Sequence, residues 1–386
     1  LMIRCFEMEK MDIVLAAPTG RAAKRMTEAT GYEAKTIHRL LEVSGGIEDG
    51  DSSHFEKNED NPIEADAVIL DEMSMVDIHL MYSLLKAIVP GTRLILVGDS
   101  NQLPSVGPGN VLKDIIDSKA FSVVRLSKIY RQAESSHIVL NAHKINAGEL
   151  ITLDNKNKDF FFFEKKDVRS VMGALVYLVK TRLPEYIGAS PFEIQVLTPM
   201  RKGELGVEHL NEVLQYYLNP ASESKKEKEG RTGVFREGDK VMQVKNNYKL
   251  EWKITNAKGF SIEEGLGVFN GDMGIIKQIN TYSERITVVF DENREAEYPF
   301  SSLDELELAY AITIHKSQGS EYPAVVLPLL SGPPILCNRN LLYTAITRAQ
   351  KCVAIAGRQS MVEQMIHNET EQKRYSGLND CLKEGL

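Results

Sequence analysis

Short apolar runs that alternate with helix-period segments constrain the fold of this chain more than any other feature. Five such runs are candidates for buried strands: 13–16, 67–70, 94–97, 194–198 and 324–329. Between 207 and 218, apolar residues recur at helical spacing along one stripe. Strands that alternate with helices are typical of a parallel sheet with helices on both faces, so we expect an α/β fold.

Two regions interrupt this pattern. Residues 44–62 are polar, acidic and rich in glycine, which predicts an excursion from the sheet that is either a loop or a hairpin. Residues 230–303 instead contain short alternating strands, with turn sequences at Asn270-Gly271 and 291–293, and predict a small inserted antiparallel barrel. A chain of 386 residues is also too long for one small core. We therefore expect domains at 1–147, at 148–229 with 306–386, and at 230–305.

Charge and cysteine usage narrow the class of protein. The net charge is −8, which argues against a protein that coats nucleic acid indiscriminately, but residues 225–258 carry ten Lys or Arg against five Asp or Glu. That stretch is either a phosphate-binding face or an ordinary solvated loop. Four widely spaced cysteines suggest neither a disulfide framework nor a zinc site, and no apolar run approaches the ~18 residues of a membrane span. We expect a cytoplasmic protein.

Carboxylates follow two of the predicted strands directly. Asp71 and Glu72 come after the run at 67–70, the minimal pattern of a Walker B site, in which one carboxylate holds Mg²⁺ and the second activates water. The alternative is a helix N-cap. The next strand ends at Asp99 and Gln102, where an amide could reach a γ-phosphate; the alternative is a polar turn.

Eight sequence blocks in a fixed order resemble superfamily 1 DNA helicases of the RecD-like branch, which includes RecD and TraA. The blocks span 14 to about 357 and read APTGRAAKRM, TIHRLL, DEMSM, GDSNQLP, YRQ, VLTPMRKGELG, AITIHKSQGSEY and NLLYTAITRA. The resemblance implies two RecA-like P-loop NTPase domains of α/β type with an inserted small SH3-like β-barrel. It also implies ATP and Mg²⁺ as cofactors.

The same resemblance implies roles for individual residues. The catalytic group is the Mg²⁺ ligand Asp71, the base Glu72, the sensor Gln102, the γ-phosphate arginine Arg131 and the arginine finger Arg348. The ATP-binding group is Gln318, Gly319 and Glu321. The DNA-binding group is Pro18, Thr19, Gly20, Arg21, His38, His315, Lys316 and Ser317. Charge gathers on the transferred phosphoryl group, so rigid cations suit such a site.

The chain departs from the family in one respect. The family begins its motor with a Walker A loop, G-x-x-x-x-G-K-S/T, and no such string occurs in these 386 residues. We expect a fragment that is inactive alone, with a natural pseudo-enzyme as the rival explanation. In relatives the 44–62 interval holds a pin that helps to split the duplex.

The implied function is ATP-dependent translocation on single-stranded DNA, 5′ to 3′, with duplex unwinding. The expected partners are single-stranded DNA, duplex–single-strand junctions and recombination or repair proteins, and no membrane. The alternatives are a DNA-stimulated translocase and a docking subunit of an exonuclease V-type complex.

Overall fold

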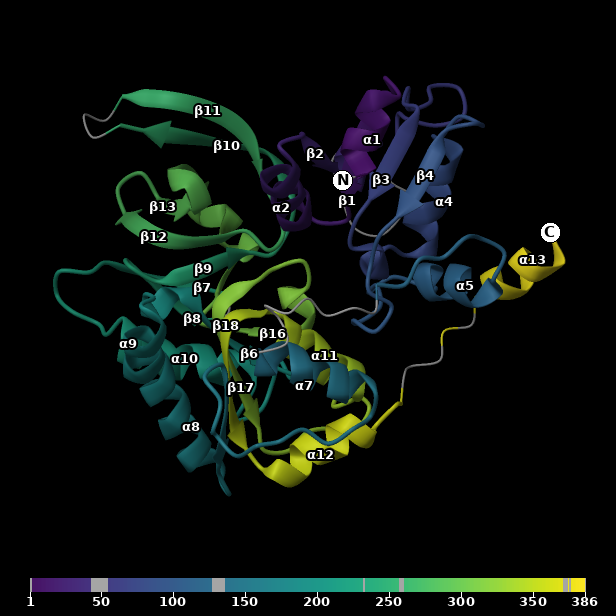
Figure 1. Cartoon of the computed structure of the whole chain (residues 1–386). Helices are drawn as coiled ribbons and strands as arrows, with labels where there is room; N and C mark the ends of the chain where they lie inside the picture. The colour runs from purple at the N-terminus through teal and green to yellow at the C-terminus, as the bar shows by residue number, and fades with distance from the viewer. Residues whose placement is uncertain are drawn as a thin grey trace. The chain divides into compact units, whose positions relative to one another are not determined.

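The computed structural model describes residues 2–42, 55–126, 136–231, 233–256, 260–370, 374 and 376–385 (Figure 1). The chain forms two compact units: unit 1 is residues 1–128 with 372–386, and unit 2 is residues 129–371. Each unit has its own parallel sheet and its own hydrophobic core.

A four-stranded parallel sheet forms the centre of unit 1, in the order β2-β1-β3-β4. Its strands are β1 (Ile13–Ala17), β2 (Ala34–Thr36), β3 (Ala67–Leu70) and β4 (Arg93–Leu96). Ala17 pairs with Thr36, and Leu70 pairs with both Ala16 and Leu96. Strands are thus confirmed at the three predicted sites, with β4 shifted by one residue. Because all these pairs are parallel, the residues after each strand emerge at one edge of the sheet.

Side-chain caps begin the main helices of unit 1. The helical segments are α1 (Met2–Met8), α2 (Gly20–Thr30), α3 (Ile37–Leu40), the 3-10 turn η1 (Met73–Met75), α4 (Ile78–Lys86) and α5 (Val111–Ser118). Thr19, Thr36 and Asp77 each accept a hydrogen bond from the first turn of the helix that follows. All four residues of β3 are buried, as expected of a central strand in a covered parallel sheet.

The end of the chain also packs into unit 1. Helix α13 (Leu378–Glu384) lies against α5. Asp114 of α5 joins the two segments, since its carboxylate accepts a hydrogen bond from Ser376 Oγ at 2.6 Å and its carbonyl accepts one from Asn379 Nδ2 at 3.1 Å. Residues from opposite ends of the sequence therefore share one unit.

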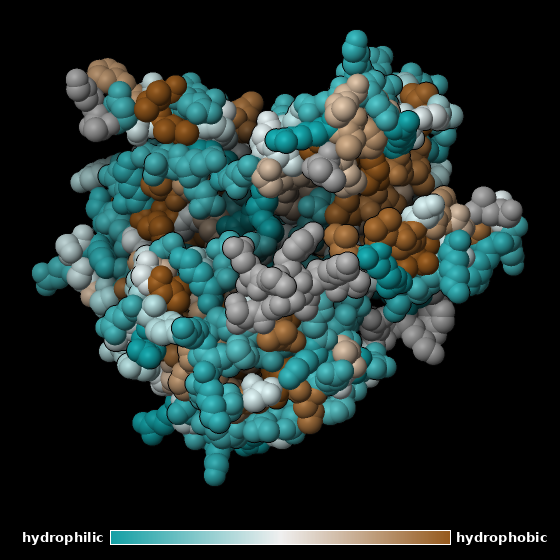
Figure 2. All heavy atoms as spheres, viewed as in Figure 1, coloured by the Kyte–Doolittle hydropathy of each residue, from teal (hydrophilic) through white to brown (hydrophobic). Residues whose placement is uncertain are grey.

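Apolar side chains gather on the surface of unit 1 near β4 and α5 (Figure 2). Exposed apolar side chains after β4 and after α5 include Val97, Val106 and several residues of the segment 121–126. Among the described residues, β4 pairs with β3 alone, so its outer side is an edge of the sheet. Edge strands leave backbone groups available for pairing.

Unit 2 contains a five-stranded parallel sheet in the order β16-β6-β17-β18-β5. The strands are β5 (Phe160–Glu164), β6 (Ile194–Thr198), β16 (Ala311–Thr313), β17 (Tyr322–Leu329) and β18 (Ala349–Gly357). This confirms the strands predicted at 194–198 and 324–329. The carboxyl ends of β6 and β16 are neighbours, because Thr198 pairs with Thr313.

Helices cover both faces of this sheet, with α8, α9 and α10 on one side and α7, α11 and α12 on the other (Figure 1). The helical segments are α7 (His137–Asn146), α8 (Val168–Tyr177), the π-helix η2 (Leu178–Arg182), α9 (Leu183–Ile187), η3 (Pro191–Glu193), α10 (Val207–Leu218), η6 (His315–Ser317), α11 (Arg339–Thr347) and α12 (Gln359–His367). Val207, Leu210 and Leu214 of α10 are buried, as the helical stripe predicts.

An antiparallel sheet of seven strands is inserted between α10 and β16, in the order β11-β10-β14-β13-β12-β9-β15. The strands are β9 (Lys240–Gln243), β10 (Asn247–Thr255), β11 (Ser261–Val268), β12 (Met273–Asn280), β13 (Arg285–Phe290), β14 (Arg294–Pro299) and β15 (Leu306–Leu308). A separate hairpin, β7 (Glu227–Gly230) with β8 (Gly233–Arg236), precedes it, and η4 (Asp291–Asn293) and η5 (Phe300–Glu305) connect its strands. Strands β10 and β11 extend beyond the others as an arm (Figure 1). The insertion is therefore antiparallel, as predicted.

A buried carboxylate fixes this insertion to the α/β part of unit 2. Asp239 has no exposed surface and accepts hydrogen bonds from Gln215 Nε2 at 2.6 Å, Asn219 Nδ2 at 2.7 Å and Tyr310 OH at 2.9 Å. A fourth comes from the backbone N–H of Arg236 at 2.6 Å. A buried polar group is stable only with such partners, so these contacts hold α10, β9 and the approach to β16 together.

The two units are divided at other points than the expected domains. Helix α7 contacts α11 in unit 2, although it falls within the expected domain 1–147. Residues 376–385 lie in unit 1, although the expected second domain runs to 386. The two units are defined by contacts within the structure, whereas the expected domains come from a resemblance to a family. The bounds of the domains therefore stay a prediction.

Two further expectations meet the structure in part. Of the predicted loop or pin at 44–62, residues 44–54 lie outside the described residues, whereas Phe55 packs against the core of unit 1. No helix in the described part of the chain is long and apolar enough to cross a membrane.

Candidate functional site

Asp71 and Glu72 emerge at the carboxyl edge of the unit 1 sheet, directly after β3. The Asp71 N–H donates to the carbonyl of Ala16 at 3.0 Å, which continues the pairing with β1. One carboxylate oxygen of Asp71 accepts the Glu72 N–H at 2.8 Å. Neither residue caps a helix through its side chain, since the cap of α4 is Asp77 and Glu72 makes no such bond to η1. Glu72 stands at the N-cap position of η1, so the N-cap alternative describes its position but not a capping bond of its side chain.

Glu72 has a strained backbone. Its φ of 54° and ψ of 40° lie in the left-handed region, which side chains other than glycine and asparagine rarely adopt. The Asp71 N–H binds Ala16, and the Met73 N–H donates to the carbonyl of Val97 at 3.0 Å, so both neighbours of Glu72 are fixed. Strain of this kind is concentrated at functional sites.

Asp99 and Gln102 form a turn after the adjacent strand, β4. Asp99 Oδ1 accepts the Asn101 N–H at 2.9 Å, and Gln102 Nε2 lies 3.5 Å from Asp99 Oδ2. Gln102 Oε1 is buried and has no hydrogen-bond partner. Orphaned buried acceptors are uncommon, so this oxygen is free to accept a donor from a bound ligand or water. The polar-turn alternative describes the backbone here but leaves this oxygen unexplained.

Close packing holds the two strand ends together. A side chain at Gly98 would have its Cβ 2.9 Å from the backbone nitrogen of Met73 and 2.9 Å from Leu112 Cδ2. Only glycine fits there, because real Cβ atoms do not approach that closely. The loop after β4 therefore lies directly against the turn that follows Glu72.

The segment from Pro18 to Arg21 follows β1 at the same edge and begins α2. Thr19 Oγ1 accepts the Ala22 N–H at 3.2 Å as the N-cap of α2. The hydroxyl hydrogen of Thr19 and the first N–H groups of α2, including that of Gly20, lie at the positive end of the helix dipole. Pro18, Thr19, Gly20 and Arg21 are all half-buried. Helix starts of this kind bind phosphate groups.

His38 follows β2, the outermost strand at the other side of β1. Its ring centroid lies 6.1 Å from that of Phe55. Burial lowers the pKa of His38, although the charge of Asp77 opposes the shift. The imidazole is therefore neutral at neutral pH and offers a hydrogen-bonding rather than an ionic contact.

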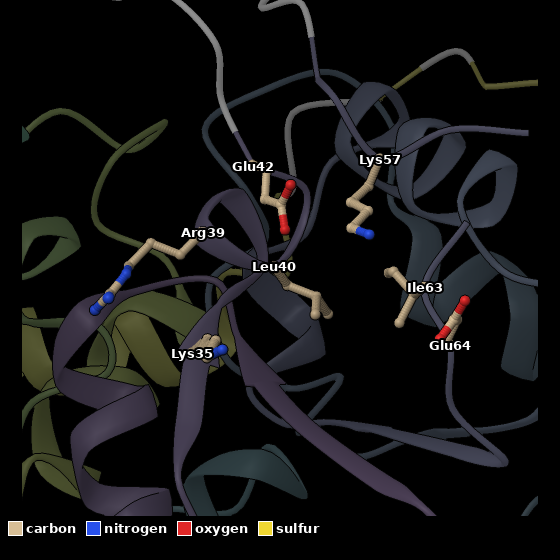
Figure 3. Close-up of a pocket in the computed structure, with 7 residues that line it drawn as sticks. All are labelled: Lys35, Arg39, Leu40, Glu42, Lys57, Ile63 and Glu64. Atoms are coloured by element: carbon tan, nitrogen blue, oxygen red, sulfur yellow. The ribbon is translucent and has the colours of Figure 1, made fainter. Parts of the chain in front are cut away.

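A cavity of about 250 Å³ lies beside α3. Its lining residues are Lys35, Arg39, Leu40, Glu42, Lys57, Ile63 and Glu64 (Figure 3). Figure 3 shows Arg39 extending away from Lys57 and Glu64. Both signs of charge line this cavity and its cations do not converge, so we assign it no ligand.

Unit 2 places the second group of predicted residues at the carboxyl end of β16. His315, Lys316 and Ser317 form η6, followed by Gln318 and by Gly319 with φ 72°. Ser317 and Gln318 are buried, whereas His315 is exposed. Protein packed around the imidazole lowers the pKa of His315.

Arg348 ends α11 beside the same loop. Its side chain is 4% exposed. Nη1 donates to the carbonyl of Ser320 at 3.3 Å and Nε to that of Thr344 at 3.3 Å. Arg348 is therefore not an exposed cation on the helix surface, and its guanidinium is held inward against the carbonyl of Ser320. Glu321, in contrast, is exposed and accepts a hydrogen bond from Gln350. Arg131, the remaining predicted catalytic residue, lies outside the described residues.

Two polar residues that sequence reasoning left unassigned also meet at this end of unit 2. Arg201 follows β6 and Glu307 lies in β15, and their side chains are 2.6 Å apart. Arg201 belongs to the block VLTPMRKGELG, whose first strand ends beside β16. Arg201 could have been found from the sequence, because it follows a predicted strand whose carboxyl end lies beside that of β16.

The donor set fits Mg²⁺ only together with a phosphate ligand. Within the described residues there is no group of three or more His, Cys, Asp or Glu that could hold a metal. Mg²⁺ is commonly held by one or two carboxylates, water and substrate phosphates. One oxygen of Asp71 accepts the Glu72 N–H, and the second is available for that purpose.

Comparison with family models divides the chain into three matches. Residues 1–108 match an AAA domain, residues 210–290 the SH3 domain of ATP-dependent RecD-like DNA helicases, and residues 308–356 a UvrD-like helicase C-terminal domain. The SH3 match covers much of the antiparallel insertion, which confirms the predicted SH3-like domain.

Curated relatives cover most of the chain. It is 36% identical over 347 residues to the ATP-dependent RecD2 DNA helicase of Deinococcus radiodurans, a match that covers 90% of this chain and 43% of that protein. It is 30% identical to the RecBCD enzyme subunit RecD of Mycolicibacterium smegmatis, over 96% of this chain and 66% of that protein. The chain thus spans about half to two thirds of these relatives.

Solved structures agree on the fold. A Pif1 helicase structure described as DNA unwinding at forked duplex DNA matches with a TM-score of 0.53 and 19% identity, over 94% of this chain and 86% of that one. A Bacteroides Pif1 helicase in complex with ADP-AlF3 and single-stranded DNA matches with a TM-score of 0.51 and 19% identity, over 92% and 84%. The predicted architecture of RecA-like α/β domains with an SH3-like insertion is confirmed.

Proposed function

The chain belongs to the RecD-like family of DNA helicases, and from that premise we propose that it forms part of an ATP-driven motor. In this proposal the motor translocates on single-stranded DNA, 5′ to 3′, and unwinds duplex. Because the chain covers only part of its relatives' length, the activity, substrates and partners of the whole protein are part of the proposal.

One observation supports the proposal most strongly. Asp71, Glu72 and Gln102 follow adjacent strands of one parallel sheet, and Gln102 Oε1 is a buried acceptor without a partner. The carboxyl edge of an open α/β sheet is where ligands bind. A water next to a γ-phosphate has to be positioned by side chains of this kind, and here two carboxylates and an amide follow adjacent strands.

Each residue then has a part in hydrolysis. Bound Mg²⁺ would neutralise charge on the phosphates, and Asp71 would hold it. Glu72 accepts the proton of the attacking water, and Gln102 orients that water through its free oxygen. Arg131 and Arg348 stabilise charge on the γ-phosphoryl group, and Gln318, Gly319 and Glu321 face the nucleotide. For this role Arg348 has to exchange the carbonyls of Ser320 and Thr344 for the phosphate.

DNA binding uses the other predicted group. Pro18, Thr19, Gly20 and Arg21 offer the start of α2 to a backbone phosphate, and His38 adds a neutral hydrogen-bonding ring. His315, Lys316 and Ser317 supply the corresponding contacts from unit 2. The cytoplasmic location remains a prediction.

A second candidate is supported by the names of relatives. The Mycolicibacterium protein is named a subunit of the RecBCD enzyme, so a docking subunit of a nuclease complex is the alternative. The Deinococcus relative, at higher identity, is named a helicase, which favours the motor. Stable co-purification with other nuclease subunits would select the docking role.

ATP hydrolysis tests the proposal directly. The 386 residues contain no Walker A loop, so this chain should hydrolyse ATP negligibly, with or without DNA. The same chain, fused behind a strand and Walker A loop of a RecD-like relative, should show DNA-stimulated hydrolysis, and its Glu72→Gln variant should lose it. Ordinary helicase turnover by the unfused chain, or an active Glu72→Gln fusion, would contradict the proposal.

A further inference from the structure

Three charged side chains from three separate elements meet at the carboxyl end of the unit 2 sheet. Arg201 lies in the loop after β6, Glu307 in strand β15 at the edge of the seven-stranded antiparallel sheet, and Lys316 in η6. Arg201 Nη2 donates to Glu307 Oε1 at 2.6 Å, and Lys316 Nζ donates to Glu307 Oε2 at 2.9 Å. Each carboxylate oxygen thus binds a different cation.

Glu307 is held rigidly between its two partners. Asn211, a buried residue of α10, donates from Nδ2 to the carbonyls of Leu308 at 3.0 Å and Ala311 at 2.9 Å. Its Oδ1 accepts the N–H of Ala311 at 2.9 Å. The backbone on the carboxyl side of Glu307 is therefore fixed to the α/β part of unit 2, and the carboxylate has little freedom to move.

The two cations keep donors that Glu307 does not use. The side chains of Arg201 and Lys316 are 45% and 29% exposed, against 17% for Glu307. A guanidinium has five N–H donors and an ammonium three. Arg201 uses Nη2 for Glu307, and its Nε lies 3.4 Å from Glu208 Oε1. The N–H donors of Arg201 and Lys316 that do not bind Glu307 can therefore bind an anion from solvent while Glu307 holds the two cations in place.

The carboxylate remains charged in this setting. Burial raises the pKa of Glu307, but the hydrogen bonds and charges of Arg201 and Lys316 outweigh it, so the pKa lies below its ordinary value. Glu307 is therefore a permanent anion at neutral pH, placed between two cations.

We propose that Glu307 is a positioning residue that sets the spacing of Arg201 and Lys316 for backbone phosphates of single-stranded DNA. This inference rests on the proposed function, because it assumes that Lys316 faces DNA. It adds Arg201 to the DNA-binding group. It also gives the antiparallel sheet a part in binding, since β15 supplies the anion that arranges the two cations.

A purely electrostatic role and a positioning role of Glu307 predict opposite effects of its replacement on DNA affinity. Replacing Glu307 by Gln removes a negative charge beside the DNA, so electrostatics alone predicts tighter binding. If Glu307 positions the cations, the same change loosens them and weakens binding. Replacing Glu307 by Asp keeps the charge but shortens the side chain, so only positioning predicts an effect.

The experiment measures binding of a fluorescein-labelled oligo(dT) by anisotropy, at several salt concentrations, to the full chain and its Glu307→Gln and Glu307→Asp variants. The matched control is Glu264→Gln, an exposed carboxylate on β11 of the same antiparallel sheet. Both Glu307 variants should bind about three- to tenfold more weakly, and the salt slope should fall by about 0.7 for each phosphate that the cations no longer bind. The control should bind as tightly as the parent chain or slightly more tightly.

Thermal unfolding shows which variants are folded, and Glu307→Asp decides the question if Glu307→Gln does not fold. Unchanged or tighter binding with an unchanged salt slope, in a folded Glu307 variant, overturns the inference and leaves the proposed function standing. If the parent chain binds no oligo(dT) even at low salt, the proposed DNA binding fails first, and the inference falls with it.

Discussion

Glu72 combines a backbone conformation that is unfavourable for its residue type with a side chain at the proposed catalytic site. Its left-handed backbone costs about 1–2 kcal/mol, and hydrogen bonds of its two neighbours keep it there. A side chain that served only the surface would gain by being glycine at this position. A strained glutamate at this edge of the sheet is consistent with the role of a base proposed for it.

Replacing Glu72 by Gly should therefore stabilise unit 1. Relief of the left-handed strain outweighs the flexibility of glycine in the unfolded chain, and we expect a gain of about 0.5–1 kcal/mol in the free energy of unfolding. Glu28→Gly, within helix α2, is the control and should cost about 1 kcal/mol. Urea unfolding of both variants compares them; equal destabilisation would show that Glu72 is not strained.

His38 links the stability of unit 1 to pH. Burial lowers its pKa in the folded state, whereas in the unfolded chain it is about 6.5. Below that pH the unfolded state binds the proton more readily, so the free energy of unfolding should decrease as the pH falls from 7 towards 5. His38→Gln should flatten this dependence in urea titrations. His79→Gln, at an exposed position of α4, is the control, and equal slopes for parent and His38→Gln would contradict the assignment.

At the scale of elements, the loop that follows Gln102 is held by the far end of the chain. Arg374 donates to the hydroxyl of Ser105 at 3.2 Å and to the carbonyl of Gly109 at 3.0 Å. It also donates to the carbonyls of Gly107 and Ser105. Residues 103–109 contain no helix or strand, so these contacts replace the hydrogen bonds that regular structure would supply.

Replacing Arg374 by Ala should loosen this loop. The change removes all the hydrogen bonds from this guanidinium, and hydrogen bonds to charged groups contribute about 1.5–3 kcal/mol, so we expect local stability to fall by about 1–3 kcal/mol. Hydrogen exchange of the amides at 103–109 measures it directly. Lys383→Ala, on α13, should leave those amides protected. Equal protection in Arg374→Ala would mean that the loop is stable without the arginine.

The same elements show what could be predicted from sequence. The strand at 67–70 and the carboxylates after it depend on a local pattern, and the structure confirms that strand and brings its end beside Gln102. The inward turn of Arg348 depends on the carbonyl of Ser320, and the role of Glu307 depends on Arg201, 106 residues away. No local period encodes such contacts, because they arise only when separate elements pack.

At the scale of the whole molecule, both units present predicted residues at the ends of parallel strands: unit 1 at the carboxyl edge of its sheet, and unit 2 both after β16 and directly before β17 and β18. Pro18 to Arg21, His38, Asp71 with Glu72, and Gln102 follow strands of the sheet β2-β1-β3-β4, and His315 to Ser317 follow β16 of the sheet β16-β6-β17-β18-β5. Because the net charge is −8, the proposed binding of DNA has to come from local groups and not from the overall field. The central claim is therefore that these motifs bind single-stranded DNA through its backbone.

Equilibrium binding of labelled oligo(dT) across a salt series tests that claim most directly. With three or four phosphate contacts, the logarithm of the binding constant should fall with the logarithm of salt concentration at a slope of about −2 to −3, and duplex of the same length should bind more weakly. A double variant, Lys316→Ala with Arg21→Ala, should reduce that slope by about 1.4, or about 0.7 for each cation removed. Binding that stays flat across the series, or no binding of single-stranded DNA at low salt, would contradict the account.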